Sequence, residues 1–216
     1  MRERSVLAGQ RHSELLLPMV AELMAEAGLG FAQLDAIVFG AGPGSFTGLR
    51  IACGAAQGLA FAHDLPVVPV VTLEALAQAA GDSRVLASLD ARLGELYLAA
   101  YERAGDADWR VVCAPALLKT DGLPELPGAW LGAGSGFAVH GAALTARYAL
   151  NQVRAELVPG AGAMARLGAV KLARGGGLPA EAAAPLYLRD KVALDVGEQA
   201  ALRASRKIAI ASETGA

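Results

Sequence analysis

The sequence has few aromatic residues, only two cysteines and no long apolar run. Five Phe, four Tyr and two Trp are the only aromatic residues among 216, although 54% of the chain is hydrophobic. Two cysteines cannot form the disulfide framework of a small secreted domain. The longest apolar candidate, residues 51–62, is shorter than the roughly 18 residues that suggest a membrane helix, and no apolar segment of signal-peptide length follows the first residues. We therefore expect a globular, cytoplasmic protein without membrane contact.

Small residues are unusually common. The chain contains 48 Ala and 26 Gly. Such a composition is typical of backbones that approach one another closely, where helices pack on helices or on sheets. The length suits one large domain or two small ones, with a core that needs no cross-links.

Charge is distributed unevenly along a chain whose net charge is only −2. Residues 1–146 carry 9 basic and 15 acidic side chains, whereas residues 147–207 carry 10 basic and 5 acidic ones. The basic region could face an RNA backbone, or it could be a solvated surface that balances the acidic part. We favour the solvated surface, because no aromatic-plus-basic platform accompanies the charge.

The apolar pattern predicts alternating strands and helices in the first part of the chain. Residues 4–8 are expected to form a short strand. Apolar residues then recur at helical spacing from Ser13 to Ala27, and Gly28 ends the run. A strand, a helix, a strand and a helix follow at residues 34–39, 49–62, 67–71 and 72–80. This order is typical of a parallel sheet with crossover helices.

The pattern changes after a predicted hinge at residues 81–84. Three strands joined by tight loops, which indicate antiparallel pairing, are predicted at residues 85–89, 95–102 and 110–113. A further strand at residues 130–131 leads into a glycine turn, and a helix is expected at residues 163–174. We therefore predict a first unit, a second unit and a partly ordered tail at residues 1–82, 83–196 and 197–216.

A glycine-rich segment, residues 40–50, joins a predicted strand to a predicted helix. Its glycines allow a sharp turn that leaves backbone amides free at the start of the helix, an arrangement that can bind anions. No Gly-Lys-Ser/Thr follows, so the segment is not a Walker A loop, and the G-x-G-x-x-G spacing is absent. A hydrolase nucleophile elbow is also excluded, because Pro43 and Thr47 occupy the positions at which glycines would flank Ser45. The sequence leaves open whether this is a structural turn or a functional loop of another kind.

The helix after this loop carries small residues on one face. Two glycines lie four residues apart there and form a stripe with an alanine, although each glycine costs roughly 1 kcal/mol in a helix relative to Ala. The close approach of another backbone would offset that cost, either from this chain's own sheet or from a helix of another subunit. The first predicted helix has a wide apolar band. We hypothesise that the two helices form a partner surface, which includes Leu15, Met19, Leu23, Gly54, Gly58 and Ala62.

Neither the histidines nor the cysteines suggest a metal site or a nucleophile. His12, His63 and His140 are isolated in the sequence, and neither H-x-x-x-H nor H-E-x-x-H occurs. Cys53 lies among small apolar residues of a predicted helix, which indicates an inert buried thiol, and Cys113 has no neighbouring His. We therefore predict no metal and no cofactor.

One group of charged residues could be catalytic. Asp90, Arg92 and Glu95 follow a predicted strand, and carboxylates so placed can do acid–base work. Asp and Arg two residues apart at a strand end more often form a local ion pair, and this is the interpretation we favour. Because no nucleophile, base and oxyanion donor come together, we assign no catalytic residue.

Several blocks of the sequence match one known family in their order. The most specific block is the loop, through Gly42, Pro43, Gly44, Ser45, Phe46, Thr47, Gly48 and Arg50. Supporting blocks, one of which holds Asp90, Arg92 and Glu95, lie at residues 12–18, 72–76, 90–97, 132–136 and 187–193. Together they resemble the TsaB (YeaZ) family. The resemblance implies an α/β protein with the actin-like ATPase (ASKHA) fold, built from two ribonuclease H-like subdomains.

The resemblance also implies a function. Members of this family are subunits of the bacterial machinery that makes threonylcarbamoyladenosine next to the anticodon of tRNA. They resemble its catalytic subunit TsaD but lack the metal ligands, and they act by forming a heterodimer with TsaD, which the ATPase TsaE joins. The implied role is non-catalytic, without a cofactor, and any tRNA contact would be indirect. Whether the isolated chain forms a homodimer is left open.

The sequence departs from the family pattern at its start. Members of the family begin with a β-hairpin whose first strand carries an Asp-Thr-Ser/Ala-Thr-like turn, whereas Met1 falls where that hairpin is already ending. We expect the first subdomain to lack its opening strands, because either the start codon is wrongly assigned or the sequence is a fragment. Unpaired strand edges would then remain, and nucleotide binding is not expected.

A second function class is also consistent with the sequence. In this alternative the chain is a stand-alone actin-like ATPase or small-molecule kinase that places phosphates on the glycine loops at residues 42–48 and 132–136. The missing acidic phosphate-loop strand distinguishes the two hypotheses, and we favour the partner-binding subunit. A metallopeptidase, a third hypothesis, would need a bound metal.

Overall fold

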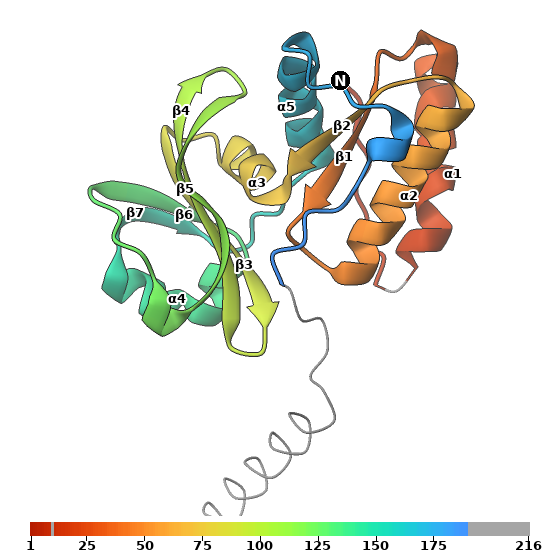
Figure 1. Ribbon diagram of the computed structural model, residues 1–216. Coiled ribbons are helices and arrows are strands. Elements are labelled where there is room, and N and C mark those ends of the chain that lie inside the picture. The colour runs from red at the N-terminus through yellow and green to blue at the C-terminus, as the bar shows by residue number, and fades with distance from the viewer. Residues whose placement is uncertain (10, 190–216) are drawn as a thin grey trace, which may run out of the picture.

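The computed structural model is a mixed α/β protein with two β-sheets (Figure 1). It describes residues 1–9 and 11–189. The predicted tail at 197–216, the end of the second predicted unit and residues 190–193 of the last matching block lie outside the described residues.

The first sheet is a parallel pair of strands with a crossover helix, as predicted. Strand β1 (Ile37–Gly42) pairs with β2 (Val67–Val71), and α2 (Phe46–Ala62) connects them. The preceding helix, α1 (His12–Ala27), ends at Gly28 in the left-handed conformation, which glycine adopts at low cost. The β-branched residues of the two strands and the 3.6-residue period of the helices explain why this part of the chain was predictable.

Helices cover this sheet from both sides. Figure 1 shows β1 and β2 between α2 on one side and α5 (Ala161–Ala173) on the other. Helix α5 comes close to the strand because Gly168 faces the side chain of Val38, where a Cβ atom would collide. Residues 161–189 fall in the second predicted unit by sequence, yet they pack against β1, β2 and α2. Chain order and packing thus differ here, and the division into two units at residues 81–84 stays a prediction.

The second sheet has five strands in the order β5-β4-β3-β6-β7. Antiparallel pairing joins β3, β4 and β5, as the tight loops indicated, while β6 and β7 run parallel to β3. The strands span Arg84–Arg92 (β3), Glu95–Gly105 (β4), Asp108–Lys119 (β5), Ala129–Ala133 (β6) and Ala149–Arg154 (β7). Two elements were not predicted from the sequence: β7 and the helix before it, α4 (Gly136–Arg147), whose backbone leaves the helical conformation at His140.

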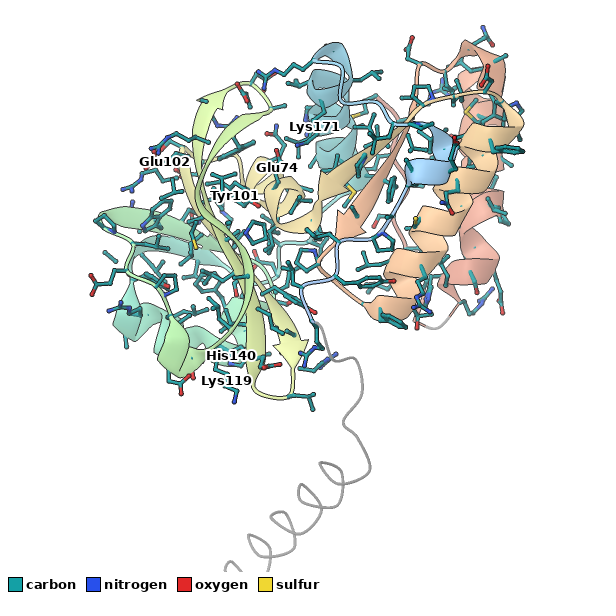
Figure 2. The ribbon with its side chains drawn as sticks, viewed as in Figure 1. Glu74, Tyr101, Glu102, Lys119, His140 and Lys171 are labelled. Atoms are coloured by element: carbon teal, nitrogen blue, oxygen red, sulfur yellow. The ribbon has the colours of Figure 1, made fainter. Side chains whose placement is uncertain are left out.

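Helix α3 (Thr72–Ala80) lies between the two sheets and contacts both. Seven of its nine residues are buried. Two of its polar side chains have partners: Gln78 accepts a hydrogen bond from Trp109 Nε1 at 2.7 Å, and Glu74 forms an ion pair with Lys171 of α5 at 3.0 Å (Figure 2). These contacts join the two halves of the molecule. Three short 3₁₀ helices complete the fold, at Phe31–Gln33 (η1), Thr120–Gly122 (η2) and Ala180–Ala182 (η3).

The prediction of a strand at residues 4–8 is wrong. These residues form no strand, and Val6 and Leu7 are exposed. Side-chain contacts hold the segment instead: Arg4 forms ion pairs with Glu22 and Glu26 of α1. So short an apolar stretch forms a strand only when a neighbouring edge is available to it. In the part of the chain that the structure describes, no helix is long and apolar enough to cross a membrane.

Candidate functional site

The small-residue stripe of α2 faces solvent. Gly54, Gly58 and Ala62 are exposed, and a Cβ atom added at either glycine would meet no described atom within 4 Å. The buried face of the helix carries different residues, Cys53, Ala56 and Ala60. Of the two neighbours that the sequence allowed for the stripe, this chain's own sheet is therefore excluded.

Helix α1 lies beside α2 and is poorly covered (Figure 1). None of its residues is buried, although Leu15, Met19 and Leu23 are half-buried and the exposed fraction of Leu17 is 52%. An amphipathic helix normally buries its apolar band. The six predicted partner residues thus lie on two adjacent helices, and the part of the chain that the structure describes leaves much of their surface open. That a partner covers them stays a prediction.

The glycine loop is built as a turn and a helix cap. Gly42 has a φ of +123°, and an added Cβ would lie 2.7 Å from the carbonyl oxygen of Leu186, so only glycine fits there. Ser45 is the N-cap of α2, and its Oγ accepts a hydrogen bond from the Gly48 amide at 3.4 Å. A methyl group at Gly44 would meet only ordinary contacts. Among the glycines of this loop, Gly42 occupies the position that requires glycine.

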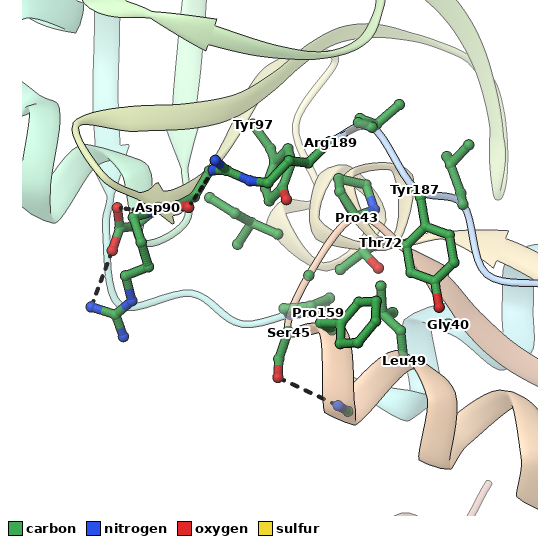
Figure 3. A pocket seen from close by; sticks show the side chains of 18 of the residues that line it. Gly40, Pro43, Ser45, Leu49, Thr72, Asp90, Tyr97, Pro159, Tyr187 and Arg189 are labelled. Carbon is green, nitrogen blue, oxygen red and sulfur yellow. Dashed lines mark hydrogen bonds and ion pairs between the residues drawn. The ribbon is translucent and has the colours of Figure 1, made fainter. Parts of the chain in front are cut away.

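Part of this loop lines a cleft of about 840 Å³ (Figure 3). The opposite wall comes from the β3–β4 hairpin. An extended C-terminal segment, residues 183–189, borders the cleft with its last four residues, 186–189. Five of the eight matching loop residues line it, whereas Gly42, Thr47 and Arg50 do not. Two largely buried residues that carry a hydroxyl group, Thr72 and Tyr97, also line the cleft.

The charged residues of the β3–β4 hairpin form ion pairs, of which one is local and one is not. Asp90 accepts a hydrogen bond from the Arg92 amide at 3.0 Å, and its second carboxylate oxygen lies 3.3 Å from the Arg92 guanidinium. Glu95 pairs instead with Arg189, at 2.7 Å. The preferred ion-pair interpretation is thus confirmed for Asp90 and Arg92, while Glu95 is not part of that pair. Sequence reasoning missed a neighbour of Asp90: His140 Nε2 lies 3.7 Å from its Oδ1 (Figure 2 labels His140).

The histidines and cysteines lie apart from one another. His12 Nδ1 is 3.2 Å from the Gly9 carbonyl, and His63 stacks on Phe31 with ring centroids 4.7 Å apart. Burial raises the pKa of the Cys53 and Cys113 thiols, which keeps them in the unreactive protonated form. Residues 1–9 and 11–189 contain no group of three His, Cys, Asp or Glu side chains that could hold a metal ion.

The C-terminal segment 183–189 connects α2 to both sheets. Gln57 of α2 donates to the Ala183 carbonyl at 3.0 Å, and the Leu186 amide donates to the Ala41 carbonyl of β1 at 2.7 Å. At its end, Arg189 donates to the Ala91 carbonyl of β3 at 2.8 Å. These contacts between segments far apart in the chain left no signal in the sequence.

The same segment completes an exposed cluster of Phe46, Arg50 and Tyr187, which we call the Arg50 cluster. The guanidinium carbon of Arg50 lies 3.9 Å from the centre of the Phe46 ring, and Nε donates to the Tyr187 hydroxyl at 3.1 Å. The two aromatic rings are 5.6 Å apart. This combination of aromatic and basic side chains is not visible in the sequence, because 137 positions separate Arg50 from Tyr187.

Comparisons with known proteins give the family. The model of the family described as TsaD, tRNA N6-adenosine threonylcarbamoyltransferase, matches residues 6–194. The tRNA threonylcarbamoyladenosine biosynthesis protein TsaB of Escherichia coli is 35% identical over 195 residues, which cover 87% of this chain and 84% of that protein. The protein of the same name from Haemophilus influenzae is 52% identical over 95 residues, 42% of this chain and 40% of that protein. The solved structure of YeaZ from Pseudomonas aeruginosa superposes with a TM-score of 0.76 at 39% identity, covering 83% of this chain and 85% of that one. The chain therefore belongs to the TsaB (YeaZ) family.

Proposed function

We propose that this chain is a non-catalytic, partner-binding subunit in the formation of threonylcarbamoyladenosine in tRNA. Its partner is the TsaD-type catalytic subunit, with which it forms a heterodimer through α1 and α2, and a TsaE-type ATPase joins the assembly. The observation that carries the proposal is the exposed stripe of Gly54, Gly58 and Ala62. The names of the Escherichia coli and Haemophilus influenzae relatives support the pathway.

The stripe supports a partner on energetic grounds. Two glycines in an exposed helix interior cost about 2 kcal/mol relative to alanine, and no described contact within the chain offsets this cost. A partner helix that approaches the bare backbone would do so, because close approach increases the number of van der Waals contacts. The half-buried apolar residues of α1 would add to the buried area.

The same proposal includes a fold and a mechanism. The two sheets correspond to two ribonuclease H-like subdomains of an actin-like fold. A protein that is structurally related to its partner can present a matching surface and hold the partner in its active arrangement. The reacting groups would then belong to the partner, and the contact of this chain with tRNA would be indirect.

Among the described residues, the cleft is the feature that best supports the alternative, a stand-alone actin-like ATPase or kinase. A nucleoside triphosphate needs cations to balance its charge. Among the described residues that line the cleft, Arg92 is paired with Asp90 and Arg189 with Glu95. The cleft therefore supports phosphate transfer less well than the open stripe supports a partner.

The test is complex formation with the TsaD-type subunit, measured as molar mass by light scattering. We expect a heterodimer for the unchanged chain and for Gly141→Leu, and none for Gly58→Leu. Gly141 is the matched control, because it lies in α4 and an added Cβ there also meets no described atom within 4 Å. Failure of the unchanged chain to bind, or binding by Gly58→Leu equal to the control, would contradict the proposal.

A further inference from the structure

The Arg50 cluster adjoins the stripe at the N-terminal end of α2. Arg50 precedes Gly54 by four residues, so both lie on the same exposed face of the helix. Phe46 is 36% exposed and Tyr187 is 43% exposed. Figure 3 shows Tyr187 on the C-terminal segment, close to the start of α2. The open stripe therefore continues into a surface that offers two aromatic rings and a cation.

Arg50 is oriented but keeps hydrogen-bonding capacity. Its Nε donates to the Tyr187 hydroxyl and its guanidinium carbon lies over the Phe46 ring, and these two contacts orient the guanidinium. Within residues 1–9 and 11–189, neither terminal nitrogen has a hydrogen-bond partner and no carboxylate lies within ion-pair distance. A guanidinium held in this way can bind a carboxylate with two parallel hydrogen bonds.

The local field favours an anion at this end of the helix. Arg50 is the only charged residue of α2, and the first turn of the helix contains no acidic side chain. The helix dipole adds a partial positive charge at the same end. Beyond Arg50 the exposed face is uncharged and consists of Gly54, Gly58, Phe61 and Ala62. A complementary surface would carry one negative group opposite Arg50 and small apolar residues farther along.

We propose that the Arg50 cluster binds an Asp or Glu side chain of the partner subunit, and so fixes how the partner helix lies along the stripe. The inference rests on the proposed function, to which it adds the chemistry of the partner's contact residue. A protein partner fits better than RNA, because binding to a phosphate backbone depends on several cations and α2 supplies one. Arg and Tyr are enriched among the residues that contribute most of the binding energy at protein interfaces, and the cluster combines the two.

The experiment measures the dissociation constant of the complex with the TsaD-type subunit. Arg50→Gln removes the charge, Arg50→Lys keeps it without the planar fork, and Tyr187→Phe removes the hydroxyl that orients Arg50. Arg147→Gln is the control, because Arg147 is a partly exposed arginine on α4, away from the stripe. Loss of one member of a desolvated charge pair weakens binding by roughly 30-fold or more. We expect that loss for Arg50→Gln, smaller losses for Arg50→Lys and Tyr187→Phe, and unchanged melting temperatures for all four variants.

The outcomes separate the inference from the proposed function. If Gly58→Leu abolishes the complex while Arg50→Gln binds within twofold of the unchanged chain, the inference is overturned and the proposed function stands. If the unchanged chain does not bind, both are overturned. If Arg50→Gln lowers retention of tRNA by the assembled complex without changing subunit affinity, the cluster binds RNA and the inference is wrong. Recovery of affinity by Arg50→Glu when one partner carboxylate is replaced by Arg would identify the residue pair and support it.

Discussion

Replacing the stripe glycines by alanine should make the free chain more stable and the complex weaker. At Gly54 and Gly58 the backbone is helical, and an added methyl group meets no described atom within 4 Å. Alanine therefore gains its helix propensity without a steric cost, about 1 kcal/mol at each position. For a chain of this size, each kcal/mol raises the melting temperature by about 2–4 °C. The double variant should melt about 4–8 °C higher than the unchanged chain.

The same methyl groups would obstruct a partner helix that needs the bare backbone. Overpacking of a close contact costs about 1–3 kcal/mol, which corresponds to a roughly 5- to 150-fold increase in the dissociation constant. The assay combines thermal unfolding of the isolated chain with titration against the TsaD-type subunit. Gly141→Ala in α4 is the control, which should gain stability and leave the affinity unchanged.

Two results would refute this reasoning. A lower melting temperature for Gly54→Ala or Gly58→Ala would mean that the glycines are needed within the chain itself. A higher melting temperature with unchanged affinity would mean that the stripe is open but that the partner does not use it.

Three further predictions concern other parts of the molecule. Gly42→Ala should lower the melting temperature strongly, because φ is +123° and the new Cβ would meet the Leu186 carbonyl. Gly44→Ala, the control, should have little effect. Equal melting temperatures of the two variants would contradict the conclusion that position 42 requires glycine. Burial raises the pKa of Tyr148 to about 12, so the neutral phenol is favoured in the folded state and stability should fall as the pH rises from about 10 towards 12. Tyr148→Phe should remove this part of the loss of stability at alkaline pH, measured by urea titrations at a series of fixed pH values. An unchanged loss in the variant would contradict the assignment to Tyr148. Burial also raises the pKa of the Cys53 thiol. At neutral pH this thiol should therefore react with a thiol reagent far more slowly in the folded chain than in the chain unfolded by urea. Equal rates would refute the burial of Cys53.

The sequence predicted best where local patterns decide the structure. The period of α1, the apolar residues of β1 and β2, and the glycines of the α2 stripe are all visible over a few neighbouring positions. Helix α4 escaped notice because Gly141 and the non-helical His140 interrupt its period. Strand β7 is short, and most of its residues are exposed at the sheet edge, so it lacks a clear apolar alternation.

The site was predictable only in part, for a different physical reason. The stripe is local to one helix, whereas the Arg50 cluster joins residues that are 137 positions apart. The ion pair of Arg189 with Glu95 likewise depends on how the C-terminal segment crosses the molecule. Such contacts follow from tertiary packing, and no spacing in a single sequence encodes them. The prediction of a strand at residues 4–8 went wrong for the same reason, since pairing needs an edge that the local pattern does not reveal.

The central claim is that this chain acts through its partner surface. The most direct measurement is the rate of threonylcarbamoyladenosine formation by a fixed amount of the TsaD-type subunit as this chain is added. We predict a rate that rises to saturation, with half of the effect at the dissociation constant of the complex, and no rise with Gly58→Leu. Product formation by this chain alone, or full stimulation by Gly58→Leu, would contradict the account.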